Sequence, residues 1–293
     1  MSSINGVLPI DKPAGPTSHD IVARVRRALG VRRIGHTGTL DPFATGLLLL
    51  CVGSSTRLAE YISAQSKSYS ARMRLGVTTD TDDLQGSTIA SSEGWRHLSA
   101  DQLLRAFEQQ KGELQQVPPQ YSAKKIDGER MYDVARRGEA VELAAATVTV
   151  HDLRVTAVEL PQVDFEVDCS TGTYIRSIAR DVGAMLGVGG HLVALRRTRI
   201  GSVRVEDAVS LDQLSDPEAV RTRLIAPAAA LGEMPRVTLD ATQIGAIRMG
   251  KSVGADAQAP EGTPIALVSV EEELVGIGEC LGQRLHPRKV FSE

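Results

Sequence analysis

The sequence of 293 residues predicts an α+β fold, with a small β-rich unit at its C-terminal end. Residues 67–76 alternate between apolar and polar side chains, which is typical of a strand with one buried face. The other predicted strands and helices alternate irregularly, without the repeated βαβ rhythm of a parallel sheet. Short apolar runs at 264–270 and 274–278 are separated by acidic residues, and such runs favour a small β-rich unit.

The first elements are a strand, a helix, a loop and a second strand. Residues 6–10 form an apolar run that predicts a short buried strand, and residues 47–52 predict another. Between them, Thr17 or Ser18 can cap a helix with one apolar face. The apolar face consists of Ile21, Val22, Val25 and Leu29, and Gly30 should end the helix. The loop 31–45 should then lead into the second strand.

Later segments predict two more helices and two more strands. Residues 98–110 should form a helix that begins after Ser99. Residues 147–160 and 163–169 should be strands joined by a proline turn. Residues 174–186 should form a helix that ends at a glycine.

The composition excludes several classes of protein. With 42% hydrophobic and 24% charged residues, the chain can bury an ordinary globular core. The N-terminus lacks the basic-then-apolar layout of a signal peptide, and the longest apolar run is far shorter than the roughly 20 residues that span a bilayer. Cys51, Cys169 and Cys280 show neither metal-binding nor redox spacing. We therefore expect a soluble protein of the reducing cytoplasm.

The net charge of −3 argues against a nucleic-acid-binding protein, but the arginines gather in two clusters. The first arginine cluster falls within ten residues that contain no acid, and consists of Arg24, Arg26, Arg27, Arg32 and Arg33. The second arginine cluster consists of Arg176, Arg180, Arg196, Arg197, Arg199 and Arg204. Basic runs are often only solvated surfaces. Because guanidinium binds phosphate in a bidentate manner, the clusters favour contacts with phosphate.

The most informative stretch is residues 35–46, Gly-His-Thr-Gly-Thr-Leu-Asp-Pro-Phe-Ala-Thr-Gly. Asp41 precedes Pro42, which pushes Asp41 towards an extended backbone. The glycines allow turns that other residues resist. A constrained loop beside a buried strand can hold a reactive carboxylate rigidly. The alternative is an ordinary Asp-Pro turn before a core strand.

This loop resembles the catalytic loop of the TruB family of tRNA pseudouridine synthases. Residues 116–138, which begin Gln-Val-Pro-Pro-Gln-Tyr-Ser, resemble the family's RNA-gripping insertion. Residues 172–199, from Gly-Thr-Tyr-Ile-Arg-Ser to Leu-Arg-Arg-Thr-Arg, resemble its second active-site segment. Asn-Gly-Val at 5–7 and Asp-Lys-Pro at 11–13 resemble its N-terminal signature.

The resemblance implies a pseudouridine synthase fold, in which a mixed, mostly antiparallel central sheet is flanked by helices. It also implies that the small C-terminal unit is a PUA-like RNA-binding domain. We expect a catalytic domain at 1–230, with the RNA-gripping insertion at about 112–146, and the C-terminal domain at 231–293.

The activity that the resemblance implies is isomerisation of uridine to pseudouridine in the T loop of tRNA, at position 55, after the base is flipped out. The implied substrate and partner is tRNA, through its T-arm stem-loop. We expect a monomer that requires no protein partner, because nothing visible in the sequence demands an oligomer. No cofactor or metal is needed, because the reaction is an isomerisation. Asp41 would be the essential carboxylate, acting as a nucleophile at C6 or C1′ or as a base at C2′. The sequence does not choose among these routes.

Two further residues carry catalytic roles by resemblance. Arg176 should lie against Asp41 and keep its carboxylate ionised and oriented, although an arginine on a helix is more often a surface residue. Tyr69 should stack on the target uracil, and its hydroxyl is a candidate for moving the C5 proton. The alternative for Tyr69 is a core tyrosine that uses its hydroxyl for a hydrogen bond.

Other residues are expected to bind the substrate. His36 resembles the histidine that fills the space left by the flipped base, although a lone histidine is often only a local hydrogen-bonding residue. Lys125, Tyr132 and Arg136 in the insertion should hold the T arm, with a solvated loop as the alternative. The remaining expected substrate-binding residues are Lys12, Tyr174 and Leu195.

Three other signals are discounted. Residues 245–252 match the P-loop pattern, but residues 239–249 predict a helix before the lysine, and the segment after 252 cannot begin one. Residues 80–86 hint at a calcium loop, yet the glycine is one place late and the twelfth position is Ser91. The six histidines show no paired spacing for zinc.

Alternative functions come from different classes. The chain could be an RNA-binding or tRNA-folding protein whose active site is incidental, because basic clusters would serve that role as well. It could be an RNA-guided synthase within a ribonucleoprotein, although such proteins carry longer C-terminal modules. A P-loop nucleotide hydrolase is rejected on context. Asp41, Tyr69 and Arg176 together favour the enzyme, since binding alone would not require that trio.

Overall fold

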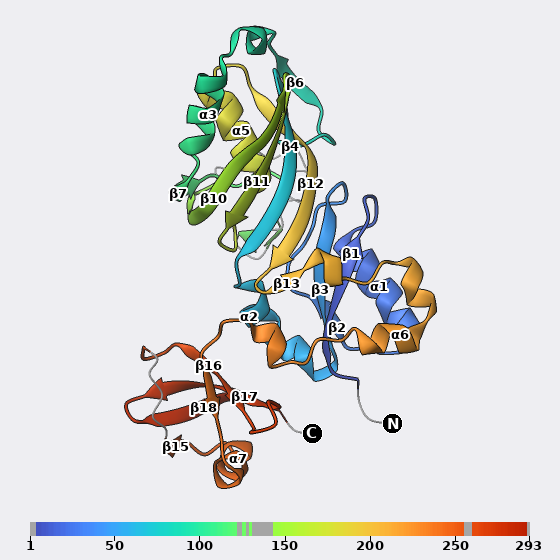
Figure 1. Ribbon diagram of the computed structural model, residues 1–293, viewed down its shortest axis with the longest axis vertical. Helices are drawn as coiled ribbons and strands as arrows, with labels where there is room; N and C mark the ends of the chain where they lie inside the picture. Colours follow the sequence, from blue (N-terminus) through green and yellow to red (C-terminus); the bar gives the residue numbers. More distant parts are fainter. Residues whose placement is uncertain (1–3, 122–124, 127–128, 131–142, 255–259, 292–293) are drawn as a thin grey trace.

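The computed structural model describes residues 4–121, 125–126, 129–130, 143–254 and 260–291. Figure 1 shows an elongated molecule, with a large twisted sheet and a separate small sheet near the C-terminus. Within the described residues, the main path of the large sheet runs β1-β3-β12-β4-β11-β10-β7, while β2 pairs with β3 and β13 with β12. Its strands are β1 Gly6–Lys12, β2 Ile34–His36, β3 Thr45–Val52, β4 Lys67–Leu75, β7 Gly112–Gln116, β10 Ala146–Glu159, β11 Gln162–Cys169, β12 Gly190–Ile200 and β13 Val203–Arg204.

The large sheet is mixed but mostly antiparallel. β3 and β12 run parallel, with Arg196 opposite Thr45 and Arg197 opposite Gly46. The other strand pairs of this sheet are antiparallel. The predicted α+β class is therefore confirmed.

The helix that follows β1 forms because its ends carry strong local signals. α1 spans Ser18–Leu29, and the Thr17 side chain accepts a hydrogen bond from the Asp20 amide while the Asp20 carboxylate accepts one from Thr17. Gly30 ends the helix at φ +66°, in the left-handed region where glycine has no steric cost. These are the ends that the sequence predicted. Ser99 caps α3 (Ala100–Glu108) in the same way.

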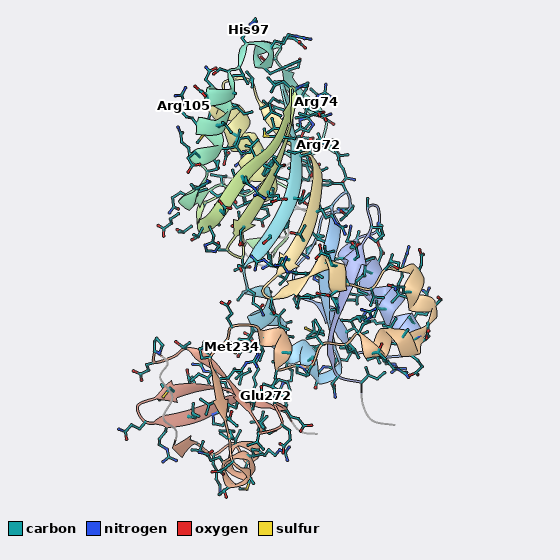
Figure 2. All side chains as sticks on the ribbon, in the orientation of Figure 1. Arg72, Arg74, His97, Arg105, Met234 and Glu272 are labelled. Carbon is teal, nitrogen blue, oxygen red and sulfur yellow. The ribbon has the colours of Figure 1, made fainter. Side chains whose placement is uncertain are left out.

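Two helices cover one face of the large sheet. α3 and α5 (Ile175–Met185) share a hydrophobic core with β4, β10, β11 and β12. The predicted inward face of β4 is buried in that core, and consists of Tyr69, Ala71, Met73 and Leu75. The opposite face of β4 carries Arg72 and Arg74, whose side chains are exposed (Figure 2). The active-site elements thus lie on the covered side of the sheet.

The central strand β12 was not predicted from the sequence. It lies between β3 and β4 and therefore joins the two halves of the sheet. Its three arginines at 196, 197 and 199 interrupt the apolar pattern that would have indicated a buried strand. The structure accommodates them by pairing or burial, as described below.

A separate small sheet forms the C-terminal part of the chain. Its strands follow the order β14-β16-β17-β18-β15, with bounds β14 Arg236–Thr238, β15 Val253–Gly254, β16 Pro264–Val268, β17 Leu274–Leu281 and β18 Arg284–Val290. α7 (Ala241–Arg248) packs on β17 and β18. The predicted β-rich unit is confirmed. We propose that the boundary between the two domains lies between residues 230 and 231, because the C-terminal part forms a compact apolar cluster of its own.

The small sheet docks on the segment after β3. That segment contains the 3₁₀ turn Gly53–Leu58 and α2 (Ala59–Ser63). Arg57 donates a hydrogen bond to the carbonyl of Val290 (2.6 Å), and its guanidinium lies 4.9 Å from the centre of the Phe291 ring. Apolar side chains of both sheets join one buried cluster. The two parts are therefore held by polar and apolar contacts together.

The remaining described elements are short. β5 (Val77–Thr79) pairs with β6 (Thr88–Ser91), and β8 (Lys125–Ile126) pairs with β9 (Glu129–Arg130). α6 spans Pro217–Thr222 and lies beside α1. Among the described residues, none of the helices has the length and apolarity that crossing a membrane requires.

Candidate active site

The loop between β2 and β3 holds Asp41 in a fixed backbone. The amide of Leu40 donates to Ser18 Oγ at the start of α1 (3.0 Å), and the amide of Ala44 donates to the Asp41 carbonyl (3.1 Å). Leu40 and Ala44 are buried in the core beside α5 and β12. The apolar neighbours of Asp41 therefore anchor the loop in the core and leave the Asp41 carboxylate partly exposed.

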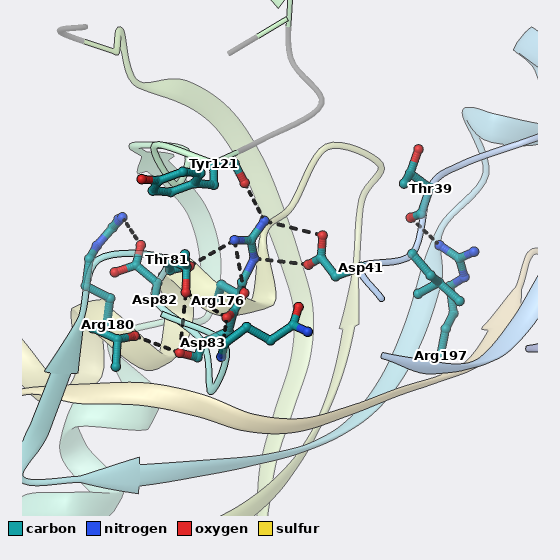
Figure 3. A network of polar contacts seen from close by, with 12 residues as sticks. Thr39, Asp41, Thr81, Asp82, Asp83, Tyr121, Arg176, Arg180 and Arg197 are labelled. Carbon is teal, nitrogen blue, oxygen red and sulfur yellow. Dashed lines mark hydrogen bonds and ion pairs between the residues drawn. The ribbon is translucent and has the colours of Figure 1, made fainter. Parts of the chain in front are cut away.

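Arg176 joins this loop to the other side of the site. From the first turn of α5, its Nε lies 3.1 Å from Asp41 Oδ2 and its Nη2 lies 3.5 Å from Oδ1 (Figure 3). Its Nη1 donates to Asp83 Oδ2 (3.2 Å) and to the Thr81 carbonyl (2.8 Å), while Nη2 also donates to the Tyr121 carbonyl (2.8 Å). One guanidinium thus bridges two carboxylates and fixes three loops.

Exposure separates the three charged groups of this bridge. The side chains of Arg176 and Asp83 are 6% and 5% exposed, whereas that of Asp41 is 34% exposed. A substrate can therefore reach Asp41, while the arginine and the second carboxylate lie behind it. This arrangement suits a reacting carboxylate with a buried counter-charge.

A second arginine extends the network along α5. Arg180 donates to Asp82 Oδ2 (3.0 Å), to Asp181 Oδ1 (2.9 Å) and to the Val117 carbonyl (2.9 Å). The acidic turn 80–83, discounted above as a calcium loop, thus supplies the counter-charges for two helix arginines. Sequence reasoning missed Asp82 and Asp83; their only signal was an acidic run distant from an arginine-rich segment.

The electrostatics of Asp41 balance burial against nearby cations. Burial raises the pKa of the Asp41 carboxyl, and the negative charge of Asp83 raises it further, while Arg176 opposes both. Lys12 and Arg197 also lower that pKa, by smaller amounts. The net direction is upward, so ionisation of Asp41 depends on these cations.

Lys12 lies beneath the loop. The residue is fully buried, and its Nζ donates to the carbonyls of Ala44 (2.6 Å), Pro13 (3.0 Å) and Pro42 (3.2 Å). Burial lowers the pKa of Lys12 to about 8. In this structure the Lys12 ammonium group is occupied by backbone carbonyls of the loop, and its expected contact with the substrate stays a prediction.

Tyr69 and Leu195 lie together in the wall behind the loop. Both are nearly buried and belong to the core cluster that includes Leu40 and Ala44. Tyr69 on β4 is opposite Arg197 on β12. Burial raises the pKa of the Tyr69 hydroxyl, which therefore stays protonated at neutral pH.

Tyr174 and His36 lie at the ends of two elements. Tyr174 is the residue before α5, and both its amide and its carbonyl are hydrogen-bonded to the side chain of Gln116. His36 is the last residue of β2, and its Nδ1 accepts a hydrogen bond from the Gly38 amide (3.4 Å). Its ring meets that of His19 edge-on, with 5.9 Å between the ring centres. Burial lowers the pKa of His36, which favours a neutral ring.

The residues that are expected to hold the T arm lie largely outside the part of the chain that the structure describes. Tyr132 and Arg136 lie outside the described residues. Lys125 begins the strand β8, but its side chain also lies outside the description. Their roles stay predictions. Among the residues that are described, no three His, Cys, Asp or Glu gather in a way that could hold a metal ion.

Comparison with known proteins places the chain in a family. The model of the TruB family pseudouridylate synthase N-terminal domain matches residues 26–175. Those of the tRNA pseudouridylate synthase B C-terminal domain and of the pseudouridine synthase II TruB C-terminal domain match residues 176–231 and 235–291. The chain belongs to the TruB family.

Two relatives extend the TruB likeness over almost the whole chain. The tRNA pseudouridine synthase B of Aromatoleum aromaticum is 43% identical over 99% of this chain and 93% of its own length. That of Thermobifida fusca is 43% identical over 98% of this chain and 99% of its own length. The resemblance noted in the catalytic loop therefore covers both parts of the molecule.

Solved structures confirm the predicted fold. A chain in the crystal structure of a Cbf5-Nop10-Gar1 complex has a TM-score of 0.79 at 28% identity, with 98% of this chain and 85% of that chain covered. A chain in an H/ACA RNP bound to a substrate RNA containing 2′-deoxyuridine has a TM-score of 0.78 at 25% identity, with the same coverage. The TruB chain thus has the pseudouridine synthase fold together with its C-terminal PUA-like domain.

The second arginine cluster of this TruB protein is used mainly inside the molecule. Arg176 and Arg197 are buried, so these two members do not form an exposed surface for phosphate. Arg196 pairs with Asp11 (2.8 Å), and Arg199 pairs with Asp168 (2.6 Å). Carboxylates and carbonyls distant in the sequence occupy these guanidinium groups, which sequence clustering could not reveal.

The P-loop-like segment 245–252 has the context that the sequence predicted. α7 ends at Arg248 and is capped by the Asp240 side chain at its start. The strand β15 follows the motif. The order of strand, loop and helix that a nucleotide site requires is therefore absent from this described segment.

Proposed function

We propose that this protein isomerises uridine to pseudouridine in the T loop of tRNA, at position 55, with Asp41 as the essential carboxylate. The observation that carries the proposal is the Asp41 carboxylate, partly exposed on a fixed loop and held 3.1 Å from the buried Arg176 guanidinium. Membership of the TruB family and two relatives named tRNA pseudouridine synthase B support the reaction and the tRNA substrate.

The reaction exchanges one bond of the nucleotide for another. The C1′–N1 bond breaks, the C1′–C5 bond forms, C5 loses a proton and N1 gains one, so no atom is added or lost. Asp41 would attack C6, attack C1′ or remove the C2′ proton; each route requires the ionised carboxylate. Arg176 would keep that carboxylate charged and would fix the direction of its oxygens.

Tyr69 would complete the catalytic trio. Its ring lies in the wall behind Asp41 and would stack on the uracil, and its hydroxyl would move the C5 proton. Because burial raises the pKa of Tyr69, the hydroxyl would act as a neutral relay that gives up its own proton as it accepts another. This trio favours an enzyme over a protein that only binds or folds tRNA.

The other residues would bring the base to this trio. Flipping the base out of its stack costs a few kcal/mol, and least in a loop that is already partly unstacked. His36 would fill the vacated space with its neutral ring, and Tyr174 and Leu195 would line the pocket. The insertion residues Lys125, Tyr132 and Arg136 would hold the T arm. We expect a cytoplasmic monomer that needs no protein partner.

Site-specific mapping tests this proposal. An unmodified tRNA transcript is incubated with the purified protein, and pseudouridine is located by chemical adduct formation and mass spectrometry. Pseudouridine at position 55, absent when that uridine is replaced by cytidine, is the expected result. Tight binding of the transcript without any pseudouridine would contradict the proposal and favour a tRNA-folding role; pseudouridine elsewhere would contradict the assigned target.

A further inference from the structure

Arg197 is a buried cation for which the reaction described so far has no use. The residue is 2% exposed, and its guanidinium donates to three backbone carbonyls: Nε to Leu47 (2.7 Å), Nη2 to Gly38 (3.2 Å) and Nη1 to Thr39 (3.4 Å). Taking a charge out of water is costly unless its new partners compensate. A surface arginine would avoid that cost, so the buried position calls for a specific reason.

The three carbonyls flank Asp41 on both sides. Gly38 and Thr39 precede Asp41 by three and two residues, and Leu47 follows it by six. The rigid planar fork of a guanidinium can hold several acceptors in a fixed relation, which the point charge of a lysine cannot. Figure 3 shows Arg197 reaching the loop from the side opposite Arg176. The two arginines therefore grip the Asp41 loop from opposite sides.

The backbone of Arg197 also holds the end of the loop. It lies opposite Gly46 in the parallel pairing of β12 with β3. Gly46 has φ +98°, and a Cβ added there would lie 2.3 Å from the Arg197 carbonyl oxygen. Only glycine permits that approach. One residue thus fixes both the start of the loop, through its side chain, and its end, through its main chain.

The charge of Arg197 acts on the same group. The charged groups that act on Asp41 are Arg176 on α5, Lys12 on β1, Arg197 on β12 and Asp83 in the acidic turn. Arg197 lowers the pKa of Asp41, in support of Arg176. It also favours the ionised form of Tyr69, against the effect of burial on the pKa of that hydroxyl.

We propose that Arg197 is a positioning residue, which locks the loop 38–47 so that the Asp41 carboxylate is held in reach of both Arg176 and the target nucleotide. The proposal rests on the pseudouridine synthase activity proposed above. It assigns Arg197 no contact with RNA, because its guanidinium is enclosed by the loop that it holds.

The test compares two substitutions with a matched control. Arg197→Lys keeps the charge but loses the fork, and Arg197→Met removes both. The control is Arg199→Lys on the same strand, because Arg199 also donates to a backbone carbonyl but is directed to Ser68, Gly201 and Asp168, outside the loop. Single-turnover pseudouridine formation on a T-arm stem-loop, RNA affinity and amide hydrogen exchange are measured for each.

The expected result is a rate lowered by about 100-fold in both Arg197 variants, the size expected when a reacting group is displaced by about 1 Å. RNA affinity should stay close to that of the wild type. Hydrogen exchange should quicken in the peptide that covers 36–46 and remain unchanged in β4. The acid side of the pH–rate profile should move to higher pH in Arg197→Met more than in Arg197→Lys, since only the first loses the charge.

Other results would overturn the proposal. An Arg197→Lys enzyme with the wild-type single-turnover rate would show that the fork is not required. A loss confined to RNA affinity would make Arg197 a binding residue. Failure of both Arg197 variants to fold, while Arg199→Lys folds, would give Arg197 a role in core stability instead. If wild-type enzyme forms no pseudouridine at all, the proposed function itself fails, and hydrogen exchange alone decides whether Arg197 locks the loop.

Discussion

The two arginine clusters look alike in the sequence, but most members of the second are less exposed in the structure than those of the first. All five members of the first arginine cluster, on α1 and the segment after it, are exposed. In the second arginine cluster, Arg176 and Arg197 are buried, Arg180, Arg196 and Arg199 are half-buried in ion pairs, and Arg204 is exposed. The difference lies in the partners: carboxylates at 11, 82, 83 and 168 face the second cluster.

This comparison separates two uses of the same side chain. Exposed arginines attract a polyanion and release counterions, so they contribute affinity that depends on salt. Buried arginines fix the position and charge of a reacting group, so they contribute to the rate. We therefore expect substitutions of the buried Arg176 and Arg197 to lower turnover, and substitutions in the first cluster to lower tRNA affinity.

The largest effect after loss of Asp41 itself should come from Arg176→Met. The substitution removes the counter-charge of Asp41, and loss of such electrostatic support costs about 100- to 1,000-fold in rate. The pKa of Asp41 should rise further, so activity should be lost at a higher pH as the solution is made acidic. A single-turnover pH–rate profile measures both changes.

The control for this variant is Arg154→Met, which breaks the exposed pair with Glu166 and should leave the profile unchanged. An Arg176→Met enzyme with a near-normal rate would contradict the account in which buried arginines contribute to the rate and exposed arginines to tRNA affinity. Circular dichroism must show that the variant is folded, because Asp83 would lose its buried partner.

Tyr69→Phe should keep the stacking ring and lose the hydroxyl. If the hydroxyl moves the C5 proton, the rate should fall by about 100-fold, at the lower end for a general acid or base. The affinity for tRNA should change little. Rapid-quench analysis of pseudouridine formation measures the loss, and a near-normal rate would refute the proton-transfer role.

Neutralising the first arginine cluster should have a smaller effect, of a different kind. Replacing Arg24, Arg27 and Arg32 by glutamine should weaken tRNA binding and should reduce the slope of log affinity against log salt by about one for each phosphate that is no longer neutralised. The single-turnover rate at saturating RNA should be unchanged. Filter binding at several salt concentrations tests this, and an unchanged slope would show that these arginines are only a solvated surface.

The smallest effect should come from Lys251→Ala. The lysine lies in the P-loop-like segment after α7, where no nucleotide site is expected. Catalysis and tRNA affinity should therefore be unchanged. A collapse of activity, or ATP binding by the wild type that this substitution abolishes, would contradict the interpretation of the segment.

Local signals made much of the fold predictable. The caps Thr17 and Ser99, the αL residue Gly30 and the alternating pattern of β4 are written within a few residues of sequence, and the structure confirms each. Such features depend on hydrogen bonds between near neighbours. They fix where elements begin and end, whatever the rest of the chain does.

Long-range contacts made other features unpredictable. Asp83 and Arg176 are 93 residues apart, and nothing near either one indicates the other. The central strand β12 was missed because its arginines suggested a surface. The burial of Lys12 under the Asp41 loop follows from packing alone, so no signal near Lys12 in the sequence indicates it. The same reason explains why the second arginine cluster was interpreted as a phosphate-binding surface.

The measurement that tests the central claim most directly is tritium release from a T-arm stem-loop whose target uridine is labelled at C5, with wild type compared with Asp41→Asn. No metal or nucleotide is added. Asn is nearly isosteric with Asp, so RNA affinity should stay within several-fold. Release by the wild type alone is the predicted result. Equal release by both proteins, or a large loss of RNA affinity in Asp41→Asn, would contradict the assignment of Asp41 as the reacting carboxylate.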